Sequence, residues 1–199
     1  MELYCLGDSL TFGYGVRAAQ RWTTLAAQKS GWQMINLGVP GDTTGGMLAR
    51  LQTQLMPDLA HRRGCRVLLM GGANDIFYGG GMESARANMG GMIHQLLTAG
   101  AVPMVGSPLP ICIEDISRSW ESVVDFPQAA QLLAQYRKWC HAYCHAFGIS
   151  CIDFYEDFLL SDGTPDHNLY LDGLHPTARG HELMAQRVVD VLLKAEEWA

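Results

Sequence analysis

Short apolar runs alternate with helix-like segments along almost the whole chain, and this alternation limits the fold more than any other feature. Strands that are each followed by a helix connect through right-handed crossovers, which make the strands parallel and place helices on both faces of the sheet. We therefore expect an α/β fold, a three-layer α/β/α sandwich. The expected strands are residues 3–6, 34–37, 67–70, 102–105 and 149–154, and the expected helices are 20–30, 43–60, 82–99, 128–147 and 177–194.

Glycine and proline residues support several of these boundaries. Gly100 and Gly148 follow two expected helices, where a left-handed C-terminal cap favours glycine. Pro176 stands where the last helix is expected to begin, a position that tolerates a missing N–H. The pair Gly45-Gly46 falls inside the expected helix 43–60 and weakens its boundaries.

Two strand orders are plausible for this sheet. We expect the flavodoxin-like order 2-1-3-4-5, because it suits five strands, and it places the first strand between the second and the third. In such a sheet the site lies beyond the carboxyl ends of the strands, where the order reverses. Ser9 follows the first expected strand, Gly41 the second and Asn74 the third. Asp172 and His175 precede the last helix and are expected at the same edge. The topology therefore predicts that these residues are neighbours in space.

The composition is typical of a compact globular protein and excludes several classes of partner. With 199 residues, 48% of them hydrophobic and 17% charged, the chain is expected to form a single domain over 1–199. A net charge of -6 without a Lys/Arg-rich stripe argues against nucleic-acid binding. No apolar run approaches the ~18–20 residues of a membrane span. The first strand follows Met1 so closely that no export signal fits, so we expect a cytoplasmic protein with its six cysteines free.

Ser9, His175 and Asp172 are the residue types that nucleophilic hydrolysis requires. A serine hydroxyl is a weak nucleophile, so it needs a base that takes its proton and an acid that orients the base. Taken alone, a serine after a strand is more often a helix cap or a turn residue than a nucleophile. Among seven histidines, His175 is preferred as the base because Asp172 lies three positions before it in a loop. The rival pair Asp166-His167 lies in the same region, but adjacent side chains diverge in an extended segment.

Gly41 and Asn74 are candidates for stabilising the negative charge of a tetrahedral intermediate. A glycine N–H and an asparagine amide are suitable donors, together with the N–H of Ser9. A simple turn at Gly41 and a helix cap at Asn74 are the alternative interpretations. Three aspartates stand beside these residues and either brace the loops or cap ordinary turns: Asp8, Asp42 and Asp75.

One further motif raises the question of a metal. Cys140-His141 and Cys144-His145 repeat with a spacing of about one helical turn. A structural zinc site normally draws its ligands from more than one element, so buried cysteines beside solvent-facing histidines are the preferred interpretation. The run Gly79-Gly80-Gly81 lacks the Lys-Ser/Thr of a phosphate loop. We therefore expect no metal and no cofactor.

The blocks Gly7-Asp8-Ser9-Leu10, Gly41, Asn74 and Asp172-x-x-His175 extend over nearly the whole chain. With these blocks the chain resembles the SGNH (GDSL-type) hydrolases, and the phrases around Gly41 and Asn74 are similar to the lysophospholipase/thioesterase-like esterase branch of that family. The resemblance implies Ser9 as the nucleophile, His175 as the base and Asp172 as its orienting acid. It also implies an oxyanion hole formed by Ser9, Gly41 and Asn74.

Such a site would cleave a small-molecule carboxylic ester through an acyl-enzyme. Short-to-medium acyl chains are expected, with lysophospholipids and thioesters among the candidate substrates. The stretch 108–127 is long for a connection, so it either forms a wall for the acyl chain or packs as a small insertion. Removal of acetyl groups from a carbohydrate is the alternative reaction, and a flavodoxin-like nucleotide- or flavin-binding module is the alternative of a different class. Apolar residues near Ser9 and Asn74 are also expected to select the substrate: Phe12, Tyr14, Ile76, Phe77 and Tyr78.

Overall fold

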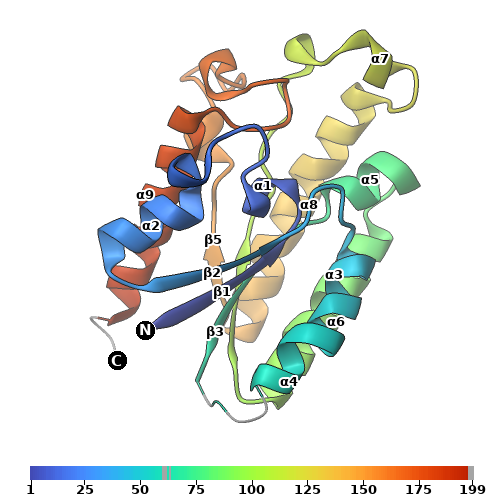
Figure 1. Ribbon diagram of the computed structural model, residues 1–199. Helices are drawn as coiled ribbons and strands as arrows, with labels where there is room; N and C mark the ends of the chain where they lie inside the picture. The colour runs from blue at the N-terminus through green and yellow to red at the C-terminus, as the bar shows by residue number, and fades with distance from the viewer. Residues whose placement is uncertain (60–61, 63, 197–199) are drawn as a thin grey trace.

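A computed structural model describes residues 1–59, 62 and 64–196 of the chain (Figure 1). Within these residues, five parallel strands have the order β2-β1-β3-β4-β5, which confirms the predicted topology. β1 therefore lies between β2 and β3, with Leu3 beside both Met34 and Arg66. The strands are β1 (Glu2–Gly7), β2 (Gln33–Gly38), β3 (Arg66–Met70), β4 (Val102–Gly106) and β5 (Ser150–Ile152).

Helices cover both faces of the sheet (Figure 1). On one face lie α2 (Trp22–Ser30) and α9 (Ala178–Glu196); on the other lie α3 (Thr44–Arg50), α6 (Glu83–Thr98) and α8 (Phe126–Phe147). Successive side chains of β1 alternate between the two layers, as the pleat of a strand requires. Leu3 and Cys5 join the core beneath α2 and α9, whereas Tyr4 and Leu6 join the core beneath α3, α6 and α8. The expected three-layer sandwich is confirmed.

The helix expected over 43–60 is interrupted. α3 passes at Leu51 into a π-helical segment, Leu51–Leu55, which is followed by α4 (Met56–Leu59). Met47, Leu51, Leu55 and Leu59 are all buried at a spacing of four. Positions four apart drift around an α-helix of 3.6 residues per turn, and the wider π turn offsets that drift and keeps these side chains on the core. Residue 60 of the expected helix lies outside the described residues.

β5 is shorter than the expected strand 149–154, because backbone N–H groups on both sides of it donate to acceptors outside the sheet. The Ile149 N–H donates to the Cys144 carbonyl at 2.8 Å, within the C-terminal turn of α8. Beyond Ile152, the Phe154 N–H donates to Ser107 Oγ at 2.9 Å, so a side-chain oxygen replaces the backbone carbonyl that would accept this N–H in a continuing strand. The hydroxyl of Ser107 in turn donates to Asp153 at 2.9 Å.

Pro176 precedes the last helix instead of opening it. α9 begins at Ala178, and Thr177 caps it, since Thr177 Oγ1 accepts the Gly180 N–H at 3.3 Å. Gly148 ends α8 with a left-handed φ of 64°, as expected for a C-terminal cap.

Two short helices at the carboxyl edge were not expected, α1 (Ser9–Phe12) after β1 and α5 (Ala73–Gly79) after β3. Each has one or two turns, which is too short for a helical period to be visible in a sequence. Among the described helices, none combines the length and the apolar character needed to cross a membrane. The remaining short elements are α7 (Arg118–Glu121) and 3₁₀ turns at Ala18–Gln20, Ile113–Asp115, Glu156–Phe158 and His167–Leu169.

Candidate active site

The loops after β1, β2 and β3 and the loop before α9 border one cavity. Ser9 is the first residue of α1, which Asp8 caps by accepting the Leu10 N–H at 2.9 Å. Gly7 permits this tight turn, because a Cβ there would lie 2.5 Å from the Met70 carbonyl oxygen. The residues that the sequence predicted to be neighbours all line the cavity: Ser9, Gly41, Asn74, Asp172 and His175.

Ser9, His175 and Asp172 form a hydrogen-bonded chain. His175 Nε2 lies 3.0 Å from Ser9 Oγ, and His175 Nδ1 lies 2.8 Å from Asp172 Oδ2. With the ring proton on Nδ1, Nε2 can accept the serine proton, which is the geometry that a general base needs. The Tyr14 ring packs against the His175 ring, with 4.6 Å between the centroids. This contact and the Asp172 hydrogen bond limit the orientation of the imidazole.

The turn from Asp172 to His175 holds the acid in place. Asp172 Oδ1 accepts the backbone N–H groups of Leu174 at 3.1 Å and of His175 at 2.8 Å. Partial burial alone would raise the pKa of Asp172, but the hydrogen bonds from the side chain and backbone of His175 outweigh it, so the pKa lies below its ordinary value. Asp172 is therefore charged at neutral pH and can stabilise an imidazolium ion.

Three donors that could bind an oxyanion border the same cavity. Gly41 has a left-handed φ of 77°, which favours glycine. The Asn74 Nδ2 donates to the Asp42 carbonyl at 2.8 Å, which orients the amide and leaves a second N–H on that nitrogen. The N–H of Ser9 belongs to the first turn of α1, where helix geometry supplies no acceptor. These three groups are suited to stabilising a negative charge beside Ser9 Oγ.

Asp42 and Asp75 tie these loops to neighbouring elements. Arg50 donates two hydrogen bonds to Asp42 Oδ2, at 2.6 and 2.9 Å. The same guanidinium reaches the Leu37 carbonyl at 2.7 Å and the Gly7 carbonyl at 3.0 Å, so it joins the ends of β1 and β2. Asp75 accepts both the N–H and the hydroxyl of Thr44, at 2.9 and 2.5 Å, which attaches α5, the helix that carries Asn74, to α3.

Asp8 is the most deeply buried acid near the site, with 2% of its surface exposed. Burial raises its pKa from 3.8 to about 6, although the Leu10 N–H and the His175 ring both act to lower it. When a carboxyl group with a raised pKa ionises, the folded state loses stability relative to the unfolded state, in which the group ionises more easily.

The cavity has a volume of about 360 Å³ and mostly apolar walls. Part of the stretch 108–127 lines the cavity, and part packs in the main core, where Val124 and Phe126 are buried. Phe12 and Ile76, which were expected to select the substrate, do not line the cavity: Arg21 lies 4.4 Å over the Phe12 ring, and Ile76 is buried in the core. The aromatic and aliphatic walls include Tyr14, Phe77, Tyr78, Leu109, Ile111, Trp120 and, unexpectedly, Leu133 of α8.

The rival pair Asp166-His167 is not assembled as an acid and a base. Asp166 Oδ1 accepts from the N–H and the amide of Asn168 at 3.0 and 2.9 Å, while His167 Nδ1 lies 3.0 Å from Asp115 Oδ2. His167 does not line the cavity. Its ring belongs to a separate group of side chains that includes Cys112.

The sequence reasoning missed a buried link between α9 and the nucleophile helix. His181 is fully buried, and its Nδ1 accepts the Trp22 N–H at 3.3 Å. The Trp22 indole N–H donates to the Leu10 carbonyl in α1 at 3.0 Å. Burial lowers the pKa of His181 to about 4, so this histidine is neutral at neutral pH. The sequence holds no signal for this pairing, because His181 stands inside a helix and no motif connects it with Trp22.

The Cys140-to-His145 motif does not form a metal-binding group within the described part of the chain. Cys140 and Cys144 are buried in the core, whereas His145 is exposed and His141 Nε2 lies 3.1 Å from Asp153 Oδ2. The preferred interpretation, buried cysteines beside outward histidines, describes this helix.

The three-layer α/β/α fold has hydrogen-bonded serine, histidine and aspartate side chains at the carboxyl edge of its sheet, an arrangement that also occurs in serine hydrolases. The sequence model of the GDSL-like lipase/acylhydrolase family matches residues 5–183, and the chain belongs to this family. Its membership makes the chain an ester hydrolase.

Solved structures with the same fold share little sequence with the chain. A member of the lipolytic protein G-D-S-L family from Veillonella parvula has 22% identity and a TM-score of 0.80, over 97% of this chain and 98% of its own. An aryl esterase from M. smegmatis has 19% identity and a TM-score of 0.78, over 97% and 98%. A carbohydrate acetylesterase from Sinorhizobium meliloti has 19% identity and a TM-score of 0.76, over 98% and 99%. No curated protein sequence matches the chain significantly.

Proposed function

We propose that the chain hydrolyses uncharged carboxylic esters with short-to-medium acyl chains through an acyl-enzyme on Ser9. The observation that carries this proposal is the chain of contacts from Ser9 Oγ to His175 Nε2 at 3.0 Å and from His175 Nδ1 to Asp172 at 2.8 Å, in the wall of a largely apolar cavity. The same contacts support the proposed roles of Ser9 as nucleophile, His175 as base and Asp172 as orienting acid.

The reaction proceeds in two steps of acyl transfer. His175 Nε2 takes the proton of Ser9 Oγ as this oxygen attacks the ester carbonyl, and Asp172 stabilises the imidazolium that forms. His175 then passes the proton to the leaving alkoxide, and an alcohol departs while the acyl group remains on Ser9. A water molecule, deprotonated by His175, attacks the acyl-enzyme and releases the acid.

The tetrahedral intermediate of each step carries a negative charge on the former carbonyl oxygen. In the proposed mechanism this oxygen accepts hydrogen bonds from the N–H groups of Ser9 and Gly41 and from the Asn74 amide. A donor of this kind typically contributes about 2.7–4 kcal/mol to the stability of the transition state.

The cavity supports the choice of substrate. Its volume of about 360 Å³ is near the lower end of the range for small-molecule sites, which favours a short-to-medium acyl chain. Its ionisable groups include the acids Asp8 and Asp172, and no lysine or arginine is among the described residues that line it. An anionic acyl group would find no cationic partner there, so we infer an uncharged one.

A series of p-nitrophenyl esters from acetate to decanoate tests the proposal. For the unaltered protein, kcat/KM is expected to rise about fourfold for each added methylene, at about 0.8 kcal/mol per buried CH₂, until the cavity is full. Ser9→Ala and His175→Ala should each lower kcat by about 10⁴-fold or more, because the members of the triad act as a unit. His167→Gln is the matched control, since this histidine lies outside the cavity, and it should retain activity.

Three results would contradict specific parts of the proposal. Full activity of Ser9→Ala would remove the catalytic assignment. Loss of activity in His167→Gln with retention in His175→Ala would reverse the choice of base. A maximum at acetate, with activity on acetylated sugars, would favour carbohydrate deacetylation, the activity that the name of the Sinorhizobium meliloti neighbour gives to that protein.

A further inference from the structure

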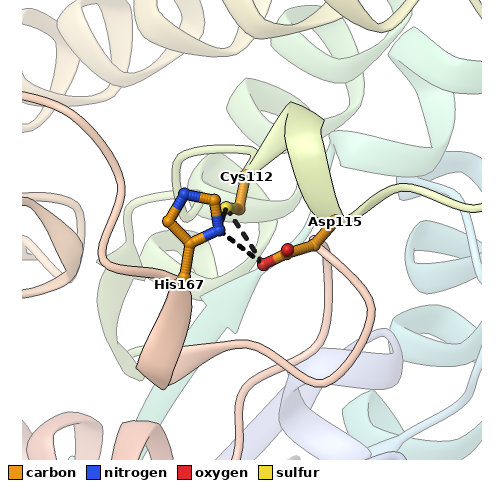
Figure 2. A group of neighbouring side chains, drawn as sticks. All are labelled: Cys112, Asp115 and His167. Carbon is orange, nitrogen blue, oxygen red and sulfur yellow. Dashed lines mark hydrogen bonds and ion pairs between the residues drawn. The ribbon is translucent and has the colours of Figure 1, made fainter.

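Three side chains of metal-ligating type converge outside the cavity that contains Ser9 (Figure 2). Cys112 Sγ lies 3.2 Å from Asp115 Oδ2 and 3.2 Å from His167 Nδ1, and the last two atoms are 3.0 Å apart. The three atoms therefore form a nearly equilateral triangle. Two of the residues come from the loop after β4 and the third from the 3₁₀ turn His167–Leu169, so the group joins segments that are distant in the sequence.

The triangle is close to one face of a zinc tetrahedron. Zinc binds cysteine sulfur at about 2.3 Å, histidine nitrogen at about 2.0–2.1 Å and carboxylate oxygen at about 2.0–2.2 Å, which gives ligand-to-ligand edges of about 3.3–3.6 Å. The observed edges of 3.0 to 3.2 Å need to lengthen by only a few tenths of an ångström. Rotations of the exposed His167 and Asp115 side chains are sufficient for this change.

The other ring nitrogen of His167 has the partner that metal-bound histidines usually have. His167 Nε2 lies 3.1 Å from a carboxylate oxygen of Glu114. Metal-ligating histidines commonly donate the second ring N–H to a carboxylate, which fixes the tautomer and makes the ligating nitrogen more basic. Glu114 is thus positioned to keep the proton on Nε2 and to leave Nδ1 free to bind a cation.

We propose that Cys112, Asp115 and His167 bind one zinc ion, with water at the fourth position. A thiolate, an imidazole and a carboxylate together suit zinc rather than magnesium or calcium, which take oxygen ligands. On binding, the proton of the Cys112 thiol and the proton on His167 Nδ1 that faces Asp115 are released to solvent, while His167 Nε2 keeps its proton toward Glu114. Cys112 is buried while the other two ligands are exposed, so the sulfur forms the floor of the site and the metal reaches it from the solvent side.

The bound ion would clamp the cavity wall to the catalytic turn. The Cys112 N–H donates to the Gly173 carbonyl at 2.9 Å, between Asp172 and His175. Leu109 and Ile111, just before Cys112, line the cavity. A metal that cross-links Cys112 to His167 therefore stabilises this contact between the wall and the turn, and it stands apart from the Ser9 chemistry.

Cobalt and zinc titrations of metal-free protein test the site. Co²⁺ should bind one ion per chain and produce the visible absorption of a tetrahedral site together with a thiolate-to-cobalt band in the near ultraviolet, and Zn²⁺ should displace it. Cys112→Ser should abolish the thiolate band, and His167→Gln should weaken binding at least 100-fold. Glu114→Gln should weaken it by about tenfold, because Glu114 acts through His167.

Matched variants separate this site from others in the chain. Cys144→Ser removes the buried cysteine of the α8 motif and His175→Ala removes the catalytic histidine; both should retain the cobalt spectrum. His167→Gln alters an exposed side chain, so it keeps the proposal testable if Cys112→Ser fails to fold. Unfolding temperatures with and without Zn²⁺ give a second readout, and zinc should raise the temperature for the unaltered protein but not for His167→Gln.

The proposal is overturned if no saturable binding occurs at micromolar metal. It is equally overturned if the thiolate band survives Cys112→Ser or disappears in Cys144→Ser or His175→Ala. Because the readouts are spectra and unfolding temperatures, failure here leaves the proposed esterase chemistry of Ser9 untouched.

Discussion

Buried Asp8 allows a quantitative test of how much an ionised carboxyl group beside Ser9 lowers the free energy of unfolding. Replacement by asparagine preserves the shape of the side chain and its oxygen, which can still accept the Leu10 N–H that Asp8 accepts at 2.9 Å. The substitution removes the ability to ionise and changes little else. Any pH dependence of the free energy of unfolding that Asp8→Asn abolishes is therefore caused by the Asp8 carboxyl group.

The magnitude follows from the pKa. Burial raises the pKa of Asp8 from its ordinary 3.8 to about 6. Between these pH values the folded chain keeps the proton while the unfolded chain has lost it, so stability falls as the pH rises. One pKa unit corresponds to about 1.36 kcal/mol, and the full loss is therefore about 3 kcal/mol above pH 6. Asp8→Asn does not suffer this loss.

Urea unfolding of both proteins between pH 3.5 and 8 measures the effect. The free energy of unfolding of Asp8→Asn, relative to the unaltered protein, should rise by about 3 kcal/mol from the acid end to the neutral end, because all other titrating groups are shared and cancel in the difference. Asp125→Asn is the matched control. Asp125 accepts the Gln128 N–H at 3.0 Å and so caps α8, but it is exposed. The free energy of unfolding of Asp125→Asn, relative to the unaltered protein, should therefore stay within about 0.5 kcal/mol over this pH range. A flat or falling difference for Asp8→Asn would refute the argument that burial dominates.

Two further substitutions test the cavity. Asn74→Ala should lower kcat by about 10²–10³-fold with little change in KM, because the amide is proposed to act on the transition state. Steady-state kinetics on a butyrate ester measure both constants. An effect on KM alone would contradict the proposed role of the amide. Trp120→Ala should lower kcat/KM about tenfold for an octanoate ester and less than twofold for acetate, because Trp120 lines the cavity. Val123→Ala, whose side chain is in the same stretch but 73% exposed, is its control, and equal losses on both esters would show that Trp120 acts on the fold and not on the acyl chain.

Three of the described strands could be predicted from uninterrupted apolar runs. The runs at β1, β3 and β4 are apolar without interruption, as strands covered on both faces must be. The helix over 43–60 misled the prediction for a specific reason. Its buried side chains repeat every four residues, a spacing that an α-helix and a π-helical segment both approximate, and only the packing against the sheet decides between them.

Distance along the chain did not decide which parts of the candidate site were predictable. Ser9 and His175 are 166 positions apart, yet topology brings both to the carboxyl edge of the sheet, because one follows the first strand and the other precedes the last helix. Asn74 and Gly41 were found by the same rule. Arg50 was not, since its role depends on a long side chain that reaches the ends of two strands from within α3.

The group of Cys112, Asp115 and His167 is the opposite case. His167 is only 52 to 55 positions from the other two residues, but both segments are irregular, so no periodic sequence pattern predicts where they run. Two hydrogen bonds hold these segments together: the Cys112 N–H donates to the Gly173 carbonyl, and the Tyr170 hydroxyl donates to the Pro110 carbonyl at 2.7 Å. Gly173 is required for the first contact, because any Cβ there would lie 2.4 Å from the Cys112 carbonyl oxygen. The glycine between Asp172 and His175 is therefore also the residue that lets the cysteine loop approach, and a larger side chain at this position would disturb both groups at once.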